Sequence, residues 1–130
     1  MEKELPQIAK EINELVKLIG DERRKLDGLG QDCAIAEVNY DKAVAVALIR
    51  LKMGKRIEVK FSLPDEPDMI ETYQSDTLAG IEKIAKGACW KQQLEMLQAQ
   101  NKYKSCITNL SALEKQLNAK QSVFRYLDET

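Results

Sequence analysis

Five residues between positions 83 and 91 combine positive charge, a glycine and an indole, and they are the strongest candidate for binding chemistry in the sequence. They are Lys83, Lys86, Gly87, Trp90 and Lys91. Gly87 is expected to end a short helix just before a long helix begins, so unpaired backbone N–H groups and lysine ammonium groups would meet there. An anion, a phosphate group or a nucleotide could bind at this point. The alternative, which we favour, is structural: Gly87 ends a helix whose last turn carries lysines, and Trp90 packs in the core.

Residues for catalysis or metal binding are scarce. The sequence has no histidine, and its serines and cysteines have no neighbouring base at a recognisable spacing. Three cysteines without a CxxC spacing do not form a zinc site; they are Cys33, Cys89 and Cys106. An acidic cluster lacks the calcium-loop pattern and is interpreted as a solvated turn; it comprises Asp65, Glu66, Asp68 and Glu71. We therefore predict a protein that is not an enzyme, with no catalytic residue, no metal and no cofactor.

Charge is distributed in blocks although the net charge is only −1. The first 32 residues carry −2, residues 33–60 carry +3, residues 61–78 carry −5, residues 79–125 carry +5 and the last five carry −2. Blocks of opposite sign could complement each other within one fold or between subunits, which is the interpretation we favour. The alternative is a basic surface that contacts nucleic acid.

The sequence contains no apolar run near the roughly 18 residues that would cross a bilayer. Its first ten residues are too acidic and too polar for a signal peptide. We therefore expect a single domain, residues 1–130, in the cytoplasm of the cell that makes it, with reduced thiols and no membrane contact.

A long C-terminal helix is predicted over residues 88–127, a stretch without glycine or proline. At 1.5 Å per residue it would be about 60 Å long. Apolar residues recur in alternate steps of three and four, as in a coiled-coil seam, except where Lys120 takes the expected apolar place. The later seam residues are Cys106, Leu110, Leu113, Leu117, Phe124 and Leu127.

Two further long helices are predicted before it, at residues 6–27 and 32–53, together with a short helix at residues 77–86. In the first, an apolar stripe runs from Leu5 to Leu26 if Glu22 or Arg23 fills one place. The sequence GLGQ, from Gly28 to Gln31, is predicted to reverse the chain between the two long helices. Gly54 would end the second helix, and Ser75, Asp76 or Thr77 would cap the short one. The fold class is therefore all-α, a helical bundle.

Residues 55–63 break the helical pattern because apolar and polar side chains alternate with a period of two. We predict a short strand or extended arm, which ends at Pro64, and a helical turn from Asp68 to Tyr73. A single strand would have to pair with its copy in another subunit, pack on the helices or remain poorly ordered.

The lengths of the predicted helices favour an oligomer. The first two would each be about 33 Å long, and a short connection would fold them back along the same half of the 60 Å helix. Part of the C-terminal seam would then be free for a second subunit, so we predict a homo-oligomer held by that seam.

The overall pattern resembles a group of small helical proteins of uncharacterised function from bacteriophages and prophages of Gram-positive bacteria. The matching segments are Ala36–Ala43 (AEVNYDKA), Ile84–Trp90 (IAKGACW), Tyr103–Lys104 and Leu113–Ser122 (LEKQLNAKQS). The arm at residues 55–73 is longer than the resemblance implies. Genes of this group lie in early regions beside recombinases and single-strand binding proteins, which implies a role in DNA metabolism or in interference with the host. The resemblance identifies no catalytic residue.

These observations lead to two hypotheses. The first is a non-enzymatic phage or prophage accessory protein that recruits or antagonises a host or phage protein through its helical faces. The alternative is a weak nucleic-acid or nucleotide-binding accessory of phage recombination or replication, in which Trp90 and its neighbouring lysines contact the ligand.

Overall fold

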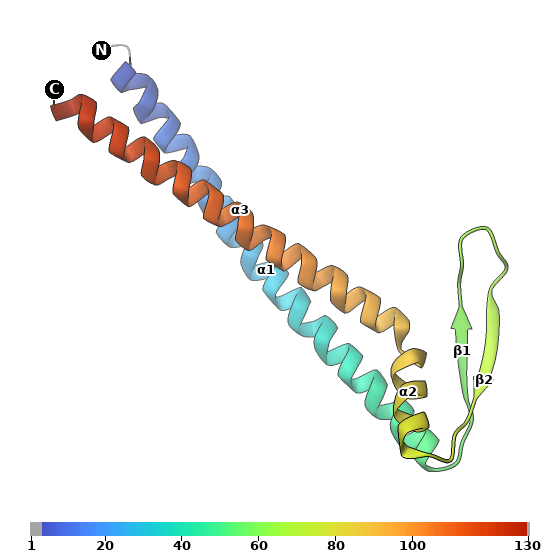
Figure 1. Cartoon of the computed structure of the whole chain (residues 1–130). Coiled ribbons are helices and arrows are strands. Elements are labelled where there is room, and N and C mark those ends of the chain that lie inside the picture. The colour runs from blue at the N-terminus through green and yellow to red at the C-terminus, as the bar shows by residue number, and fades with distance from the viewer. Residues whose placement is uncertain (1–3, 130) are drawn as a thin grey trace. The chain divides into compact units, whose positions relative to one another are not determined.

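The computed structural model describes residues 4–129, and its elements are predominantly helical (Figure 1). They are α1 (Glu4–Lys52), β1 (Ile57–Phe61), β2 (Met69–Tyr73), α2 (Leu78–Ala88) and α3 (Trp90–Glu129). The chain forms two compact units. The first unit joins the described residues up to Cys33 with those from Ala99 onward, and the second comprises Ala34–Gln98. Among the described helices, none has an apolar stretch long enough to cross a membrane.

Helix α1 is continuous, so the predicted pair of helices at 6–27 and 32–53 is corrected to one helix of 49 residues. The sequence GLGQ does not reverse the chain. Partial burial continues through Leu26, Leu29 and Cys33, which keep the three-and-four spacing across the glycines. Each glycine inside a helix costs about 1 kcal/mol relative to alanine, and packing along this stripe outweighs that cost.

Gly54 ends α1, as predicted. Its φ angle of 75° lies in the left-handed region, which a glycine adopts without a steric penalty. The Gly54 N–H donates to the Leu51 carbonyl and the Lys55 N–H donates to the Arg50 carbonyl. These two bonds form a Schellman motif, which satisfies carbonyl groups at the end of the helix.

The first unit is an antiparallel pair formed by the N-terminal part of α1 and the C-terminal part of α3. Leu15, Ile19 and Cys106 are buried between them. The Cys106 thiol donates to the Glu22 carboxylate at 3.3 Å. Glu22, rather than Arg23, is therefore the charged residue within the apolar stripe from Leu5 to Leu26. At the polar place of the α3 seam, Lys120 forms an ion pair with Glu11. Both charged residues that interrupt the apolar stripes therefore face partners across the helix pair.

The C-terminal seam is occupied within this unit. Cys106 is buried, and the remaining seam residues are partly buried: Leu110, Leu113, Leu117, Phe124 and Leu127. Leu117 lines the same groove as Val16 and Ile19 of α1. The length argument for a second subunit on this seam was wrong, because it required α1 to fold back at residues 28–31. Supercoiling of the pair and a role of the seam in oligomers stay predictions.

The predicted extended arm is the first strand of a β-hairpin. Strand β1 pairs antiparallel with β2, from Ile57 opposite Tyr73 to Phe61 opposite Met69. The helical turn predicted for Asp68–Tyr73 was wrong, because most of that segment is β2. Asp65, with a φ angle of 64°, lies in the connection between the strands. The arm thus finds its pairing partner within the chain.

The core of the second unit is formed by residues of α1, β1 and α2 together with Cys89, which directly follows α2. Leu51 is the most deeply buried large side chain in it, with 1% of its surface exposed. The other buried members of the cluster are Ala47, Ile57, Ile81, Ala85 and Cys89. Ala85 is fully buried, and its small side chain allows neighbouring elements to approach α2 closely. This core positions one face of the hairpin over α2.

The boundaries of α2 and α3 differ from the predicted 77–86 and 88–127. Thr77 caps α2, and its side chain accepts a hydrogen bond from the Gly80 N–H at 3.1 Å. Gly87 lies inside α2, and Cys89 is the residue between the two helices. Cys89 is therefore the whole connection between α2 and α3.

Candidate functional site

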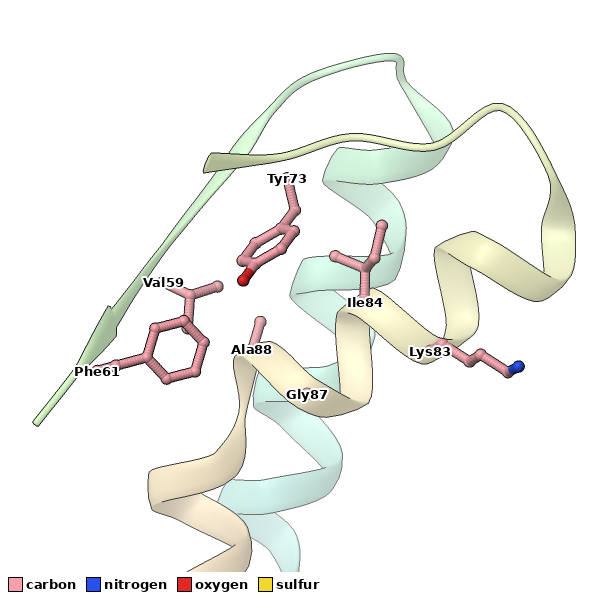
Figure 2. A pocket seen from close by; sticks show the side chains of 7 residues that line it. All are labelled: Val59, Phe61, Tyr73, Lys83, Ile84, Gly87 and Ala88. Atoms are coloured by element: carbon pink, nitrogen blue, oxygen red, sulfur yellow. The ribbon is translucent and has the colours of Figure 1, made fainter. Parts of the chain in front are cut away.

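A small apolar cavity lies between the hairpin and α2 in the second unit (Figure 2). Its volume is about 260 Å³. The residues that line it come from both strands and from two turns of the helix; they are Val59, Phe61, Tyr73, Lys83, Ile84, Gly87 and Ala88. The period of two in β1 explains the arrangement, since Val59 and Phe61 point to the same side of the hairpin.

Tyr73 contributes a hydroxyl group to the residues that line this cavity. In Figure 2 its ring extends from β2 toward α2, and its hydroxyl points toward Val59. That hydroxyl donates a hydrogen bond to the Glu71 carboxylate. Hydrogen bonding to Glu71, together with the negative charge of Glu71, raises the pKa of Tyr73 above its ordinary value. The hydroxyl is thus held by a neighbour on its own strand.

Trp90 fastens the hairpin to the start of α3. Its indole Nε1–H donates to the Lys60 carbonyl at 3.2 Å. Its ring also stacks with Phe61, with 6.5 Å between the ring centroids and 7° between the ring planes. The indole therefore contributes both an apolar contact and a backbone hydrogen bond to the packing of β1.

The structure brings only part of the predicted phosphate site together. The Lys91 Nζ atom lies 5.8 Å from the centre of the Trp90 ring, a cation–π arrangement. Lys83 and Gly87 line the cavity, but Figure 2 shows the Lys83 side chain extending away from it. Lys86 is exposed on α2. Because α2 continues through Gly87, the predicted turn that would expose backbone N–H groups there does not exist. Phosphate binding by these residues stays a prediction.

No comparison supplies a relative. No family model, no curated protein and no solved structure matches this chain. The site is therefore interpreted from its own geometry.

The thiols are placed as core groups in both units. Burial raises the pKa of the Cys89 thiol. Burial also raises the pKa of the Cys106 thiol, and its hydrogen bond to Glu22 acts in the same direction. A raised pKa keeps a thiol protonated and weakly nucleophilic at neutral pH. Among residues 4–129, no group of acidic or cysteine side chains is arranged to hold a metal ion.

Strand β2 was not predicted from the sequence, and neither was the contribution of Tyr73 and Glu71. The available signal was the second short run, Met69–Tyr73, which is separated from β1 by a segment with two prolines. Two short runs flanking a turn-rich segment are typical of a hairpin. Phe61 and Trp90 are far apart in sequence, and no local pattern predicts their stacking.

Proposed function

We propose that this chain is a non-enzymatic interaction protein that assembles as a homo-oligomer. The observation that carries this proposal is an exposed apolar stripe on α1 within the second unit. Its members are Ile35, Val38, Val46 and Ile49 of α1 and Met53, which directly follows that helix. Each exposes between 44% and 63% of its surface.

The α1 stripe lies on a different face of the helix from the core. At 100° per residue, spacings of three, four and eight residues place its members within one arc of the helix. Lys42 is the one charged residue within that arc. The core residues Ala47 and Leu51 fall on another arc. A helix that is apolar on two faces typically packs against a neighbour on each. This supports an interface on the α1 stripe.

A second copy of the chain fits the charges beside the α1 stripe. The first half of this stretch carries Glu37, Asp41 and Lys42, a net charge of −1. The second half carries Arg50 and Lys52, a net charge of +2. Two copies packed antiparallel would place Asp41 of each near the basic end of the other. Opposite charges beside an apolar seam favour one orientation of the helices.

The proposal is tested by placing a charge in the α1 stripe. Val46→Glu and Ile49→Glu should convert the oligomer to monomer in sedimentation velocity, with an unchanged helical circular dichroism spectrum. Val123→Glu is the matched control, because Val123 is similarly exposed, at 47%, on α3. A wild-type chain that is monomeric at about 100 μM, or stripe variants that assemble like the wild type, would refute the oligomer.

The wider role follows from the resemblance described above. We propose an accessory protein of a phage or prophage, in the host cytoplasm, that acts on a host or phage protein. The nucleic-acid alternative gains no support from the Trp90 region, because that indole is engaged by Lys60, Phe61 and Lys91.

A further inference from the structure

The two edges of the hairpin differ. The Lys60 carbonyl points away from β2, since it accepts the indole N–H of Trp90 on the outer side of β1. Glu58, also on β1, lines a groove with residues of α1. Residues of α1 and Trp90 of α3 therefore border the outer edge of β1, where the Lys60 carbonyl already has a donor.

The outer edge of β2 is open. In an antiparallel ladder, opposite residues direct their backbone groups either both inward or both outward. Ile70 is opposite Lys60, so its N–H and carbonyl also point outward, and by the period of two so do those of Thr72. The sheet has only two strands in the described chain, and both residues are exposed, Ile70 to 65%. An unpaired edge of this kind accepts an added strand.

The charge around this edge selects the partner. Residues 61–78 contain five acidic side chains and no basic one. Asp68 is neutralised by Lys60 at 3.1 Å, on one face of the hairpin. Glu71 remains on the opposite face, where its nearest described hydrogen-bond donor is the neutral hydroxyl of Tyr73. An incoming strand would therefore be favoured by a basic side chain opposite Glu71 and by apolar side chains opposite Ile70.

We propose that the open edge of β2 binds an extended segment of a partner protein in which apolar and basic side chains alternate. The strand site rests on the proposed interaction role and adds the chemistry of the partner. It uses a surface separate from the α1 stripe. A second copy of β2 is disfavoured as the occupant. Its own acidic residues would approach those of the first copy, and like charges across a sheet are destabilising.

Binding can be measured with synthetic peptides and the full chain. A fluorescein-labelled peptide of about seven residues that alternates valine and lysine should bind, as fluorescence anisotropy at about 50 mM salt would show. A valine–glutamate peptide should not. A glycine–lysine peptide of equal charge separates strand addition from charge attraction alone. Equal binding of the valine–lysine and glycine–lysine peptides would overturn the proposal.

Backbone pairing is tested from both sides of the interface. Thr72→Pro removes an outward N–H that the hairpin does not use, and should weaken binding by about ten-fold or more, whereas Thr72→Val should not. N-methylation of alternate peptide amides should weaken binding to the same extent. Because the protein is then unchanged, this result does not depend on whether Thr72→Pro disturbs the hairpin. Glu71→Lys should reverse the preference toward the valine–glutamate peptide.

Peptide binding and self-association, measured on the same variants, distinguish the strand site from the oligomer interface. Val46→Glu should abolish assembly but leave peptide binding intact. Failure of wild-type binding while assembly persists would refute only the strand site. Self-association that Thr72→Pro abolishes and Val46→Glu does not would replace the partner strand by a second copy and overturn the proposal.

Discussion

The Trp90 indole donates its N–H to the carbonyl of Lys60 across 3.2 Å, which connects the first residue of α3 to β1. A short hairpin is marginally stable by itself in water. This bond, the stacking of Phe61 on the indole and the burial of Ile57 and Val59 hold the hairpin against the helices of the second unit.

Trp90→Phe tests this connection. Phenylalanine keeps an aromatic ring but leaves the Lys60 carbonyl without its donor, so the hairpin should open more often. The loss should be about 1 kcal/mol, the usual net value of one hydrogen bond. Amide hydrogen exchange of β1 and β2 should accelerate, while amides in the first unit, such as that of Ile19, should exchange as in the wild type. Unchanged exchange in the hairpin would show that the indole N–H does not hold it.

Two glycines of α2 should respond oppositely to alanine. A Cβ atom at Gly80 would lie 2.8 Å from the Thr77 Oγ1 atom that caps the helix, and closer still to Ser75. Gly80→Ala should therefore lower the free energy of unfolding by about 1 kcal/mol, because displacing the cap outweighs the gain in helix propensity. At Gly87 a Cβ atom would meet nothing within 4 Å. Gly87→Ala should therefore raise the free energy of unfolding by about 0.5–1 kcal/mol. Urea denaturation measures both, and shifts in the same direction would contradict the described cap.

The ion pair of Asp68 and Lys60 should make the hairpin sensitive to acid. Hydrogen bonds from Lys60 and Ser62 lower the pKa of the Asp68 carboxyl in the folded state. A lowered folded pKa contributes stability that is present above the unfolded pKa of about 3.9 and is lost as the pH falls through the folded value. Hairpin protection, followed by amide exchange, should therefore weaken below about pH 4.

Lys60→Met is the control for this acid sensitivity. It removes the main cause of the shift but keeps a long side chain at an exposed position. The carboxyl of Asp68, titrated by carbon NMR, should then move toward its ordinary pKa. A titration that is the same in both proteins would show that Lys60 does not hold the carboxylate.

Local sequence patterns were enough to predict the helical seams and several helix ends. The three-and-four spacing predicted the partly buried positions of α3, including the polar place of Lys120. It also required a charged residue, Glu22 or Arg23, in the apolar stripe from Leu5 to Leu26. Gly54 was predicted to end a helix, and it adopts the positive φ angle that favours glycine there. Thr77 was one of three candidate caps, with Ser75 and Asp76, and its hydroxyl caps α2. Such features depend on neighbours within about one turn, so a single sequence contains the information.

Whether Gly28, Gly30 and Gly87 end helices depends on contacts between distant parts of the chain. Local rules interpret a glycine as an end because it costs about 1 kcal/mol within a helix. Gly30 lies against the ring of Tyr103, and a Cβ atom there would approach that ring to 3.3 Å. The close approach is a contact between residues more than 70 positions apart, and no local pattern contains it.

Strand β2 also depends on contacts between residues that are distant in sequence. Met69–Tyr73 is too short to specify a strand alone, and it becomes one because β1 offers it hydrogen bonds while Trp90 holds β1 in place. The same packing engages the Trp90 indole, which was a candidate ligand-binding group in the sequence. Strand pairing and side-chain stacking join distant residues, and their energies arise only when the chain has folded.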